Sequence, residues 1–117
     1  MISINESDID IITIVDKKIE GTNVRPLTLL EKRCMDDGKK YYMLSYSLSE
    51  PLDKFKRCEC CGEFYDHNLE YCPDCDDNGL SIAIISDIPE IIYQALETGK
   101  VVIIGLSTQD DPIRLEL

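Results

Sequence analysis

Four cysteines are the residues of this sequence whose type and spacing indicate a chemical role. Cys58 and Cys61 form one C-x-x-C pair, Cys72 and Cys75 form a second, and ten residues separate the pairs. A tetrahedral zinc ion binds four thiolates at about 2.3 Å, and each C-x-x-C turn supplies two of them from one short loop. The sequence therefore predicts one structural zinc ion per chain, held by Cys58, Cys61, Cys72 and Cys75.

Two neighbouring residues support this interpretation. Gly62 follows the first pair and can adopt the left-handed backbone that such a loop needs, and Pro73 stiffens the second turn. A site closed by four thiolates leaves no position for water or substrate, which distinguishes structural from catalytic zinc. We therefore expect the metal to stabilise the fold rather than to catalyse a reaction.

Disulfide bonds are the competing use of these cysteines. The sequence begins without a basic and apolar leader, and no apolar run approaches the ~18 residues of a membrane span. We therefore expect a cytoplasmic, reducing location, where C-x-x-C pairs are more often metal sites than disulfides. Cys34 is expected as a small buried apolar side chain. Cys60 is a spare thiol beside the metal, and its role stays open.

Residues 58–75 resemble the short zinc-ribbon modules, in which C-x-x-C-G is followed by an aromatic residue directly before C-P-x-C. Here Gly62 fills the glycine position and Tyr71 the aromatic one, whereas Asp76 stands where the family usually has glycine. The resemblance does not extend to the rest of the chain. Rubredoxin iron sites also have two such pairs, but with a much longer spacer, so zinc is expected rather than iron.

The resemblance implies a fold of two cysteine-bearing knuckles joined by a hairpin. Residues 63–65 and 69–71 would be the strands of this hairpin, and residues 66–68 its turn. Zinc ribbons act as binding or scaffolding modules in many proteins, so the resemblance does not fix a function.

The charge of the chain is uneven. The net charge is −11, and the metal-binding segment 58–79 has seven Asp or Glu residues and no Lys or Arg. Four thiolates and a zinc ion add a formal charge of about −2. Because nucleic-acid affinity depends on cations that neutralise phosphates, direct nucleic-acid binding by this segment is not expected.

An alternative function depends on the basic middle of the chain. Segment 32–57 combines cations with tyrosines, and aromatic side chains beside cations commonly hold single-stranded nucleic acid. The alternative is therefore a nucleic-acid-binding accessory protein, although strand tyrosines more often pack against their neighbours. The residues concerned are Lys32, Arg33, Lys39, Lys40, Lys54, Lys56 and Arg57, with Tyr41, Tyr42 and Tyr46.

The first half of the chain reads as strands. Residues 9–15 are rich in β-branched side chains, and residues 24–34 and 40–48 flank the Asp-Gly turn signal of residues 36–39, which predicts a hairpin. The competing interpretation makes residues 27–35 a short helix. Residues 50–57 are interpreted as a charged connector.

The C-terminal third predicts a β-α-β unit. Residues 80–85 and 101–104 read as strands, and residues 113–117 as an edge strand. Between the first two, Asp87 and Glu90 form a capping-box pattern, and Gly99 marks a helix end. The predicted apolar helix face consists of Ile88, Ile91, Ile92, Ala95 and Leu96. The predicted class is α+β: one domain, residues 1–117, with a small sheet, at least one packed helix, and a zinc ribbon inserted at 58–79.

We expect a non-enzymatic function. The only histidine, His67, lies in the ribbon turn, and no nucleophile–histidine arrangement stands out. An acidic, zinc-binding protein of this kind is expected to act by protein–protein interaction with a basic surface, as a regulator or inhibitor of a nucleic-acid-handling protein. The residues expected to contact the partner are Glu63, Phe64, Tyr65, Glu70 and Tyr71. The sequence predicts no oligomeric state.

Overall fold

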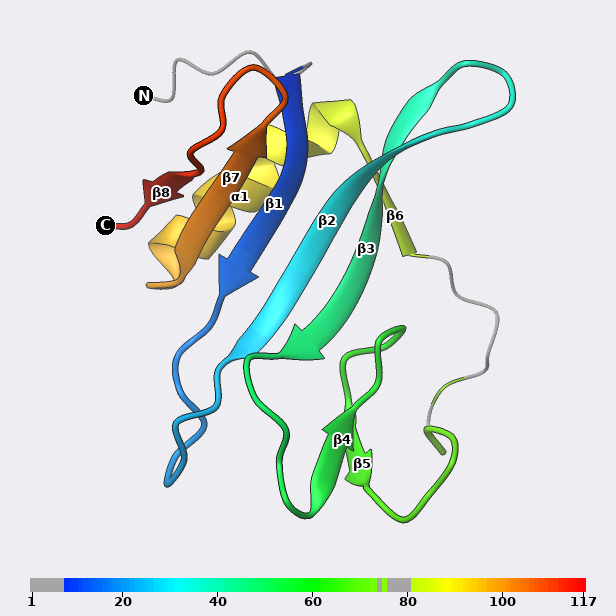
Figure 1. Cartoon of the computed structure of the whole chain (residues 1–117), viewed down its shortest axis with the longest axis vertical. Helices are drawn as coiled ribbons and strands as arrows, with labels where there is room; N and C mark the ends of the chain where they lie inside the picture. The colour runs from blue at the N-terminus through cyan, green and yellow to red at the C-terminus, as the bar shows by residue number, and fades with distance from the viewer. Residues whose placement is uncertain (1–7, 74, 76–80) are drawn as a thin grey trace.

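The computed structural model describes residues 8–73, 75 and 81–117. Within them the chain forms a six-stranded sheet, a separate two-stranded sheet and one α-helix (Figure 1). This mostly-sheet structure with one helix is compatible with the predicted α+β class. The predicted end of the ribbon, at residue 79, lies outside the described residues.

The six-stranded sheet has the order β6-β3-β2-β1-β7-β8, and all neighbouring strands are antiparallel. The predictions of a first strand and of a C-terminal edge strand are both confirmed. The strands are β1 (Ile9–Val15), β2 (Pro26–Cys34), β3 (Lys40–Leu48), β6 (Ser81–Ile84), β7 (Val101–Leu106) and β8 (Ile113–Leu115).

Strands β2 and β3 form the predicted hairpin. Cys34 pairs with Lys40, and Gly38 closes the turn with φ +85°, a conformation that favours glycine. The backbone N–H of Met35 donates to Lys39 O at 2.7 Å. The competing interpretation of residues 27–35 as a helix is wrong, because their backbone groups pair with β3 on one side and β1 on the other.

Helix α1 (Ile88–Glu97) follows a short 3₁₀ turn, η2 (Ile85–Asp87). The predicted end is confirmed: Gly99 has φ +82°, its N–H donates to Leu96 O, and the N–H of Lys100 donates to Ala95 O. The predicted capping box is absent. The Asp87 carboxylate accepts from Ile84 N–H at 3.3 Å instead, which closes the 3₁₀ turn.

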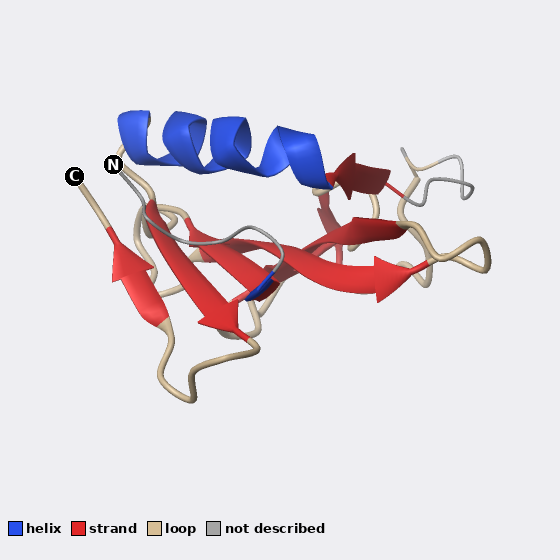
Figure 2. Cartoon of the chain, turned by 90° about the horizontal axis from the view of Figure 1, so that it is seen from above, coloured by secondary structure: helices blue, strands red, loops and turns tan. Residues whose placement is uncertain are grey.

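The helix connects two distant strands. Strands β6 and β7 run parallel, since four antiparallel pairings separate them, and β3, β2 and β1 lie between them. The predicted β-α-β order is therefore present, but its strands are not neighbours. Helix α1 leads from the edge strand β6 to β7, the strand beside the opposite edge, and it covers one face of the sheet (Figure 2).

The core lies between α1 and this covered face. The Tyr42 side chain is fully buried there, and its hydroxyl donates to Ile9 O at 2.8 Å. The predicted helix face is confirmed, with Ile91 partly buried and the other four residues buried. Residues of the opposite face of the sheet alternate with the core residues along each strand. The buried core residues are Ile9, Ile12, Ile14, Leu30, Tyr42, Ala83, Ile88, Ile92, Ala95, Leu96, Val102 and Ile104.

The two-stranded sheet differs from the predicted ribbon hairpin. Strand β5 (Phe64–Asp66) pairs with β4 (Phe55–Arg57), which lies in the predicted connector, and residues 69–71 form no strand. The loop between the strands explains this pairing. The N–H of Gly62 donates to Cys58 O at 2.9 Å and the N–H of Cys58 donates to Glu63 O at 2.8 Å, so the chain reverses at the cysteines themselves.

Candidate metal centre

The β4–β5 hairpin carries the first three cysteines of the centre. Cys58, Cys60 and Cys61 lie in its turn, and the φ of Gly62, +79°, confirms the predicted left-handed conformation. Cys72 and Cys75 follow β5, and the N–H of Cys75 lies 3.4 Å from Cys72 O. A tight turn thus brings each C-x-x-C pair together.

The sulfur atoms form two overlapping groups. Those of Cys58, Cys61 and Cys72 all lie within 4.8 Å of one another, as do those of Cys58, Cys60 and Cys75. The Sγ atoms of Cys61 and Cys72 are 3.6 Å apart. This cluster of five cysteines can bind a metal ion, and it is compatible with a zinc-ribbon-like module. Of the four predicted ligands, Cys58, Cys61 and Cys72 share one group, whereas Cys75 lies in the other group with Cys58 and Cys60.

The sequence left the role of Cys60 open, and the structure places it in the cluster as a fifth thiol. A tetrahedral site needs only four thiolates, so one thiol of the five is surplus. Cys58 is shared by both groups. Loss of Cys58 therefore removes one sulfur from each of these two groups.

Backbone groups of the turn act on the thiol of Cys58. The backbone N–H groups of Cys61 and, to a smaller extent, Cys60 point to its sulfur and lower its pKa to about 7, although burial opposes the shift. Desolvation raises the pKa of Cys60, and the negative charges of Cys75 and Cys58 raise it further.

The Arg57 side chain connects the hairpin to the six-stranded sheet. Its Nε donates to Gly62 O at 3.0 Å, and its Nη1 donates to Leu27 O at 3.1 Å and Ser47 O at 3.2 Å. Its guanidinium carbon lies 4.9 Å from the centre of the Tyr46 ring. Burial lowers the pKa of Arg57, but a guanidinium stays protonated in proteins.

Tyr46 completes this connection. Its N–H donates to Glu59 O at 3.0 Å, and its ring lies against Gly62. A Cβ atom at Gly62 would come within 3.2 Å of the ring. A side chain at position 62 would therefore meet both left-handed strain and the ring of Tyr46.

Replacing Gly62 with alanine should destabilise the hairpin by about 2 kcal/mol, because the new methyl group combines left-handed strain with crowding against Tyr46. The matched control is Gly38→Ala, which has a similar φ of +85° and no atom within 4 Å. It should cost about 1 kcal/mol. Hydrogen exchange of the amides in each turn measures the two losses, and equal losses would show that the contact with Tyr46 contributes nothing.

The residues predicted to contact a partner lie around the hairpin. Tyr71 is 80% exposed and Phe64 42%, whereas Tyr65 is half-buried with Lys56 Nζ 6.0 Å from its ring centre. Sequence reasoning missed two further apolar side chains here, Phe55 at 50% and Leu69 at 44% exposure. Phe55 could have been found from the sequence, because it is an aromatic residue between charged neighbours in a segment expected to be exposed. Glu63 and Glu70 are both exposed.

Other residues singled out from the sequence lie apart from the cluster. Cys34 is exposed, so the expectation of a buried thiol is wrong: it stands at the end of β2, where the hairpin projects from the sheet. His67 Nδ1 lies 3.2 Å from Lys54 O and does not belong to the sulfur groups. Of the tyrosines in the basic segment, Tyr42 is in the core and Tyr46 contacts Arg57.

No helix among residues 8–73, 75 and 81–117 combines the length and the apolar character needed to cross a membrane. Comparison with protein-family models, with curated proteins and with solved structures gives no significant match to this chain.

Proposed function

We propose that this protein is a non-enzymatic zinc protein that binds a partner protein through its metal-stabilised hairpin. The observation that carries the proposal is the cluster of five cysteine sulfurs at the turn of β4 and β5. All-sulfur donor sets suit zinc, and four thiolates close its coordination shell. Cys58, Cys61, Cys72 and Cys75 are the proposed ligands of one Zn²⁺ per chain, in a zinc-ribbon arrangement.

The side chains around this cluster suggest the chemistry of the partner. Phe64 and Tyr71 are exposed apolar or amphipathic groups of the kind that anchor protein interfaces. Glu63 and Glu70 flank them, and the bound thiolates add negative charge. A partner surface with apolar pockets and basic surroundings matches this combination.

Basic surfaces are typical of proteins that handle nucleic acid. We therefore propose that the partner belongs to this class and that the acidic hairpin regulates or inhibits it by occupying its basic surface. The nucleic-acid-binding alternative has less support, because Tyr42 is buried and Arg57 is engaged by three carbonyl groups.

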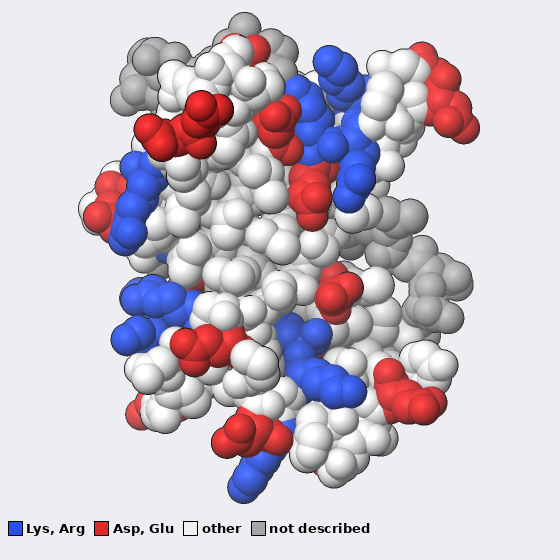
Figure 3. All heavy atoms as spheres, in the orientation of Figure 1, with Lys and Arg blue, Asp and Glu red and all other residues white. Residues whose placement is uncertain are grey.

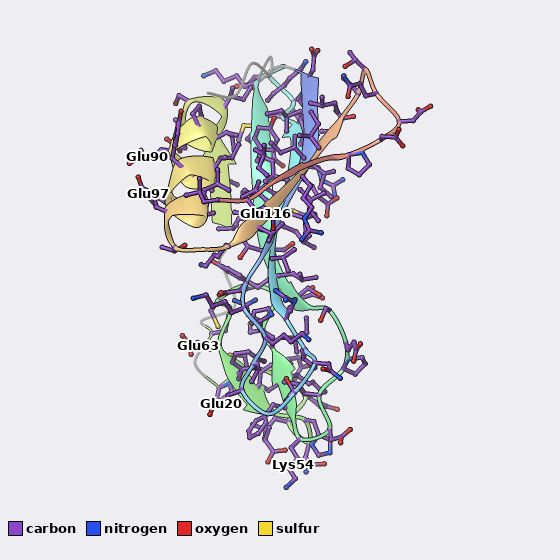
Figure 4. All side chains as sticks on the ribbon, turned by 90° about the vertical axis from the view of Figure 1, so that its left-hand side faces the viewer. Glu20, Lys54, Glu63, Glu90, Glu97 and Glu116 are labelled. Carbon is purple, nitrogen blue, oxygen red and sulfur yellow. The ribbon has the colours of Figure 1, made fainter. Side chains whose placement is uncertain are left out.

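A charge-reversal experiment tests this proposal. In cross-linking capture from the native cell, the double variant Glu63→Lys and Glu70→Lys should lose the basic partner by about tenfold or more, since each change replaces attraction with repulsion. The matched control is Glu90→Lys with Glu97→Lys, which makes the same charge change on α1, remote from the hairpin (Figure 4).

The two double variants have the same net charge. A difference between them therefore reports the position of the charges on the hairpin, whereas an equal effect reports the net charge of the chain. Equal loss of the partner in both would contradict binding through the hairpin. A mobility-shift titration with single-stranded nucleic acid at low salt should show no complex. Tight binding there that weakens steeply with salt would favour the nucleic-acid alternative.

A further inference from the structure

The face of the six-stranded sheet opposite α1 has an unusual composition for a surface. Among the described residues, no helix covers this face (Figure 2), yet most of its side chains are apolar. We call it the open face. Cross-strand pairing defines its apolar members as Ile11, Val15, Leu27, Leu29, Tyr41, Met43, Ile82, Ile84, Val101 and Ile103.

These side chains lie in rows across the strands, with Thr13 and Glu31 as polar interruptions. Ile103, Thr13 and Leu29 are neighbours in one row. Met43 and Ile82 continue the next row. Ile82 and Ile84 are 49% and 52% exposed, and the others are partly exposed. Contiguous apolar patches of this kind mark interaction sites, because single soluble chains rarely leave them in water.

We propose that the open face binds the open face of a second copy of this chain, so that two sheets pack face to face around a twofold axis. Two sheets packed in this way form the core of a β-sandwich, with side chains from both inner faces interdigitating. Each copy already has the α1 layer on its other side. The dimer would then have four layers, helix, sheet, sheet and helix, with a second core between the sheets.

The charges of the open face suit a copy of itself. Figure 3, which looks onto this face, shows a wide uncharged area in its middle. Two charged side chains that pairing places on this face, Glu31 and Arg33, form an ion pair at 3.4 Å. The third charged side chain on this face is Arg114, and its Nη2 lies 3.4 Å from Glu116 Oε2. The face therefore carries nearly balanced charge, although the whole chain carries −11.

The excess negative charge lies elsewhere. Seven carboxylate residues belong to segment 58–79. Glu90 and Glu97 project from α1, on the other side of the sheet (Figure 4). Repulsion between two copies thus acts over a distance and is screened by salt, with a Debye length of about 10 Å at 0.1 M. Apolar contact between the faces is not weakened by salt.

Sedimentation equilibrium of the zinc-loaded protein tests this inference. At micromolar concentration the mass should be twice that of the 13.3 kDa chain. The dimer should tighten when salt is raised to about 0.5 M, since screening reduces the like-charge repulsion. A single 13.3 kDa species at every concentration would overturn the proposal, and so would a dimer that dissociates with salt.

Variants locate the interface. Leu29→Arg, in the middle of the open face, should raise the dimer dissociation constant by about 100-fold or more, because a twofold axis introduces the charge twice. Ile84→Arg should act in the same direction, and its side chain is exposed enough to keep the fold. The control is Tyr93→Arg, on α1 and 53% exposed, which should leave the dimer unchanged.

Circular dichroism and zinc content confirm that each variant is folded. A dimer that survives Ile84→Arg and a folded Leu29→Arg uses another surface, which overturns the proposal. Dissociation by Tyr93→Arg to the same extent does so as well. The result is independent of the proposed hairpin function, because the variant Glu63→Lys with Glu70→Lys should still dimerise.

Discussion

Replacing Cys58 with serine is expected to abolish zinc binding and to release the β4–β5 hairpin from its folded state. Cys58 belongs to both sulfur groups, so no three-cysteine combination survives its loss. A serine hydroxyl is not ionised at neutral pH and is a poor zinc ligand. Because structural zinc binding is worth about 10–16 kcal/mol in small zinc domains, affinity should fall by about a thousandfold or more. Elemental analysis should show zinc falling from one equivalent per chain towards zero.

The matched control is Cys60→Ser. It removes a thiol from the same turn but leaves the four proposed ligands, Cys58, Cys61, Cys72 and Cys75, in place. This variant should keep one equivalent of zinc, whereas Cys72→Ser should lose it like Cys58→Ser. Zinc retained by Cys58→Ser, or lost by Cys60→Ser, would show that the ligand set is a different choice of four from the five cysteines.

The six-stranded sheet should remain folded in Cys58→Ser. The buried core of the described residues comes from that sheet and α1, with no member between residues 55 and 75. Hydrogen exchange should therefore accelerate in the hairpin and stay slow for β1 and β7. Cooperative loss of protection throughout the chain would instead show that the hairpin is part of the folding core.

Local patterns of this sequence predicted most of the elements. The Asp-Gly signal at Gly38 predicted the β2–β3 hairpin, and the spacing of Ile88, Ile92 and Leu96 predicted the buried face of α1. Both features depend on residues that are close in the sequence. The cysteine spacing is a local signal too, and it predicted four members of the sulfur cluster.

Non-local pairing could not be predicted in the same way. The positions of β6 and β7, with three strands between them, depend on which strands bury which faces. The pairing of β4 with β5 replaced the ribbon hairpin that the family resemblance implied, because the turn from Cys58 to Gly62 brings Arg57 opposite Phe64. The local hairpin pattern does not determine whether β5 pairs with residues 55–57 or with residues 69–71.

The structural role of Arg57 could not be predicted from the sequence. In the sequence it is one of seven cations in a basic segment and a candidate for contact with phosphate. In the structure it satisfies three backbone carbonyl groups from three different segments, those of Gly62, Leu27 and Ser47. A rigid guanidinium with several N–H donors is suited to such a junction. Its position between hairpin and sheet implies that it stabilises their contact.

Replacing Arg57 with methionine should therefore detach the hairpin from the sheet while zinc stays bound. Hydrogen bonds from a charged group contribute about 1.5–3 kcal/mol each, and three carbonyls lose their partner in a half-exposed setting, so we expect a loss of about 2–4 kcal/mol. The probe is the backbone N–H of Tyr46, which donates to Glu59 O across the junction. Its free energy of opening, from hydrogen exchange of the zinc-loaded protein, should fall by this amount.

Two matched variants separate the junction from general effects of charge. Arg33→Met removes an arginine that forms an ion pair with Glu31 on the same strand, and it should change the opening free energy by about 0.5 kcal/mol or less. Arg57→Lys keeps the charge, but its single ammonium group cannot reproduce the planar fork, so its effect should be intermediate. If the opening free energy of the Tyr46 N–H is the same in Arg57→Met as in Arg33→Met, the junction does not depend on the guanidinium. The hairpin is then positioned by the hydrogen bond from Tyr46 to Glu59 and by the ring of Tyr46 against Gly62.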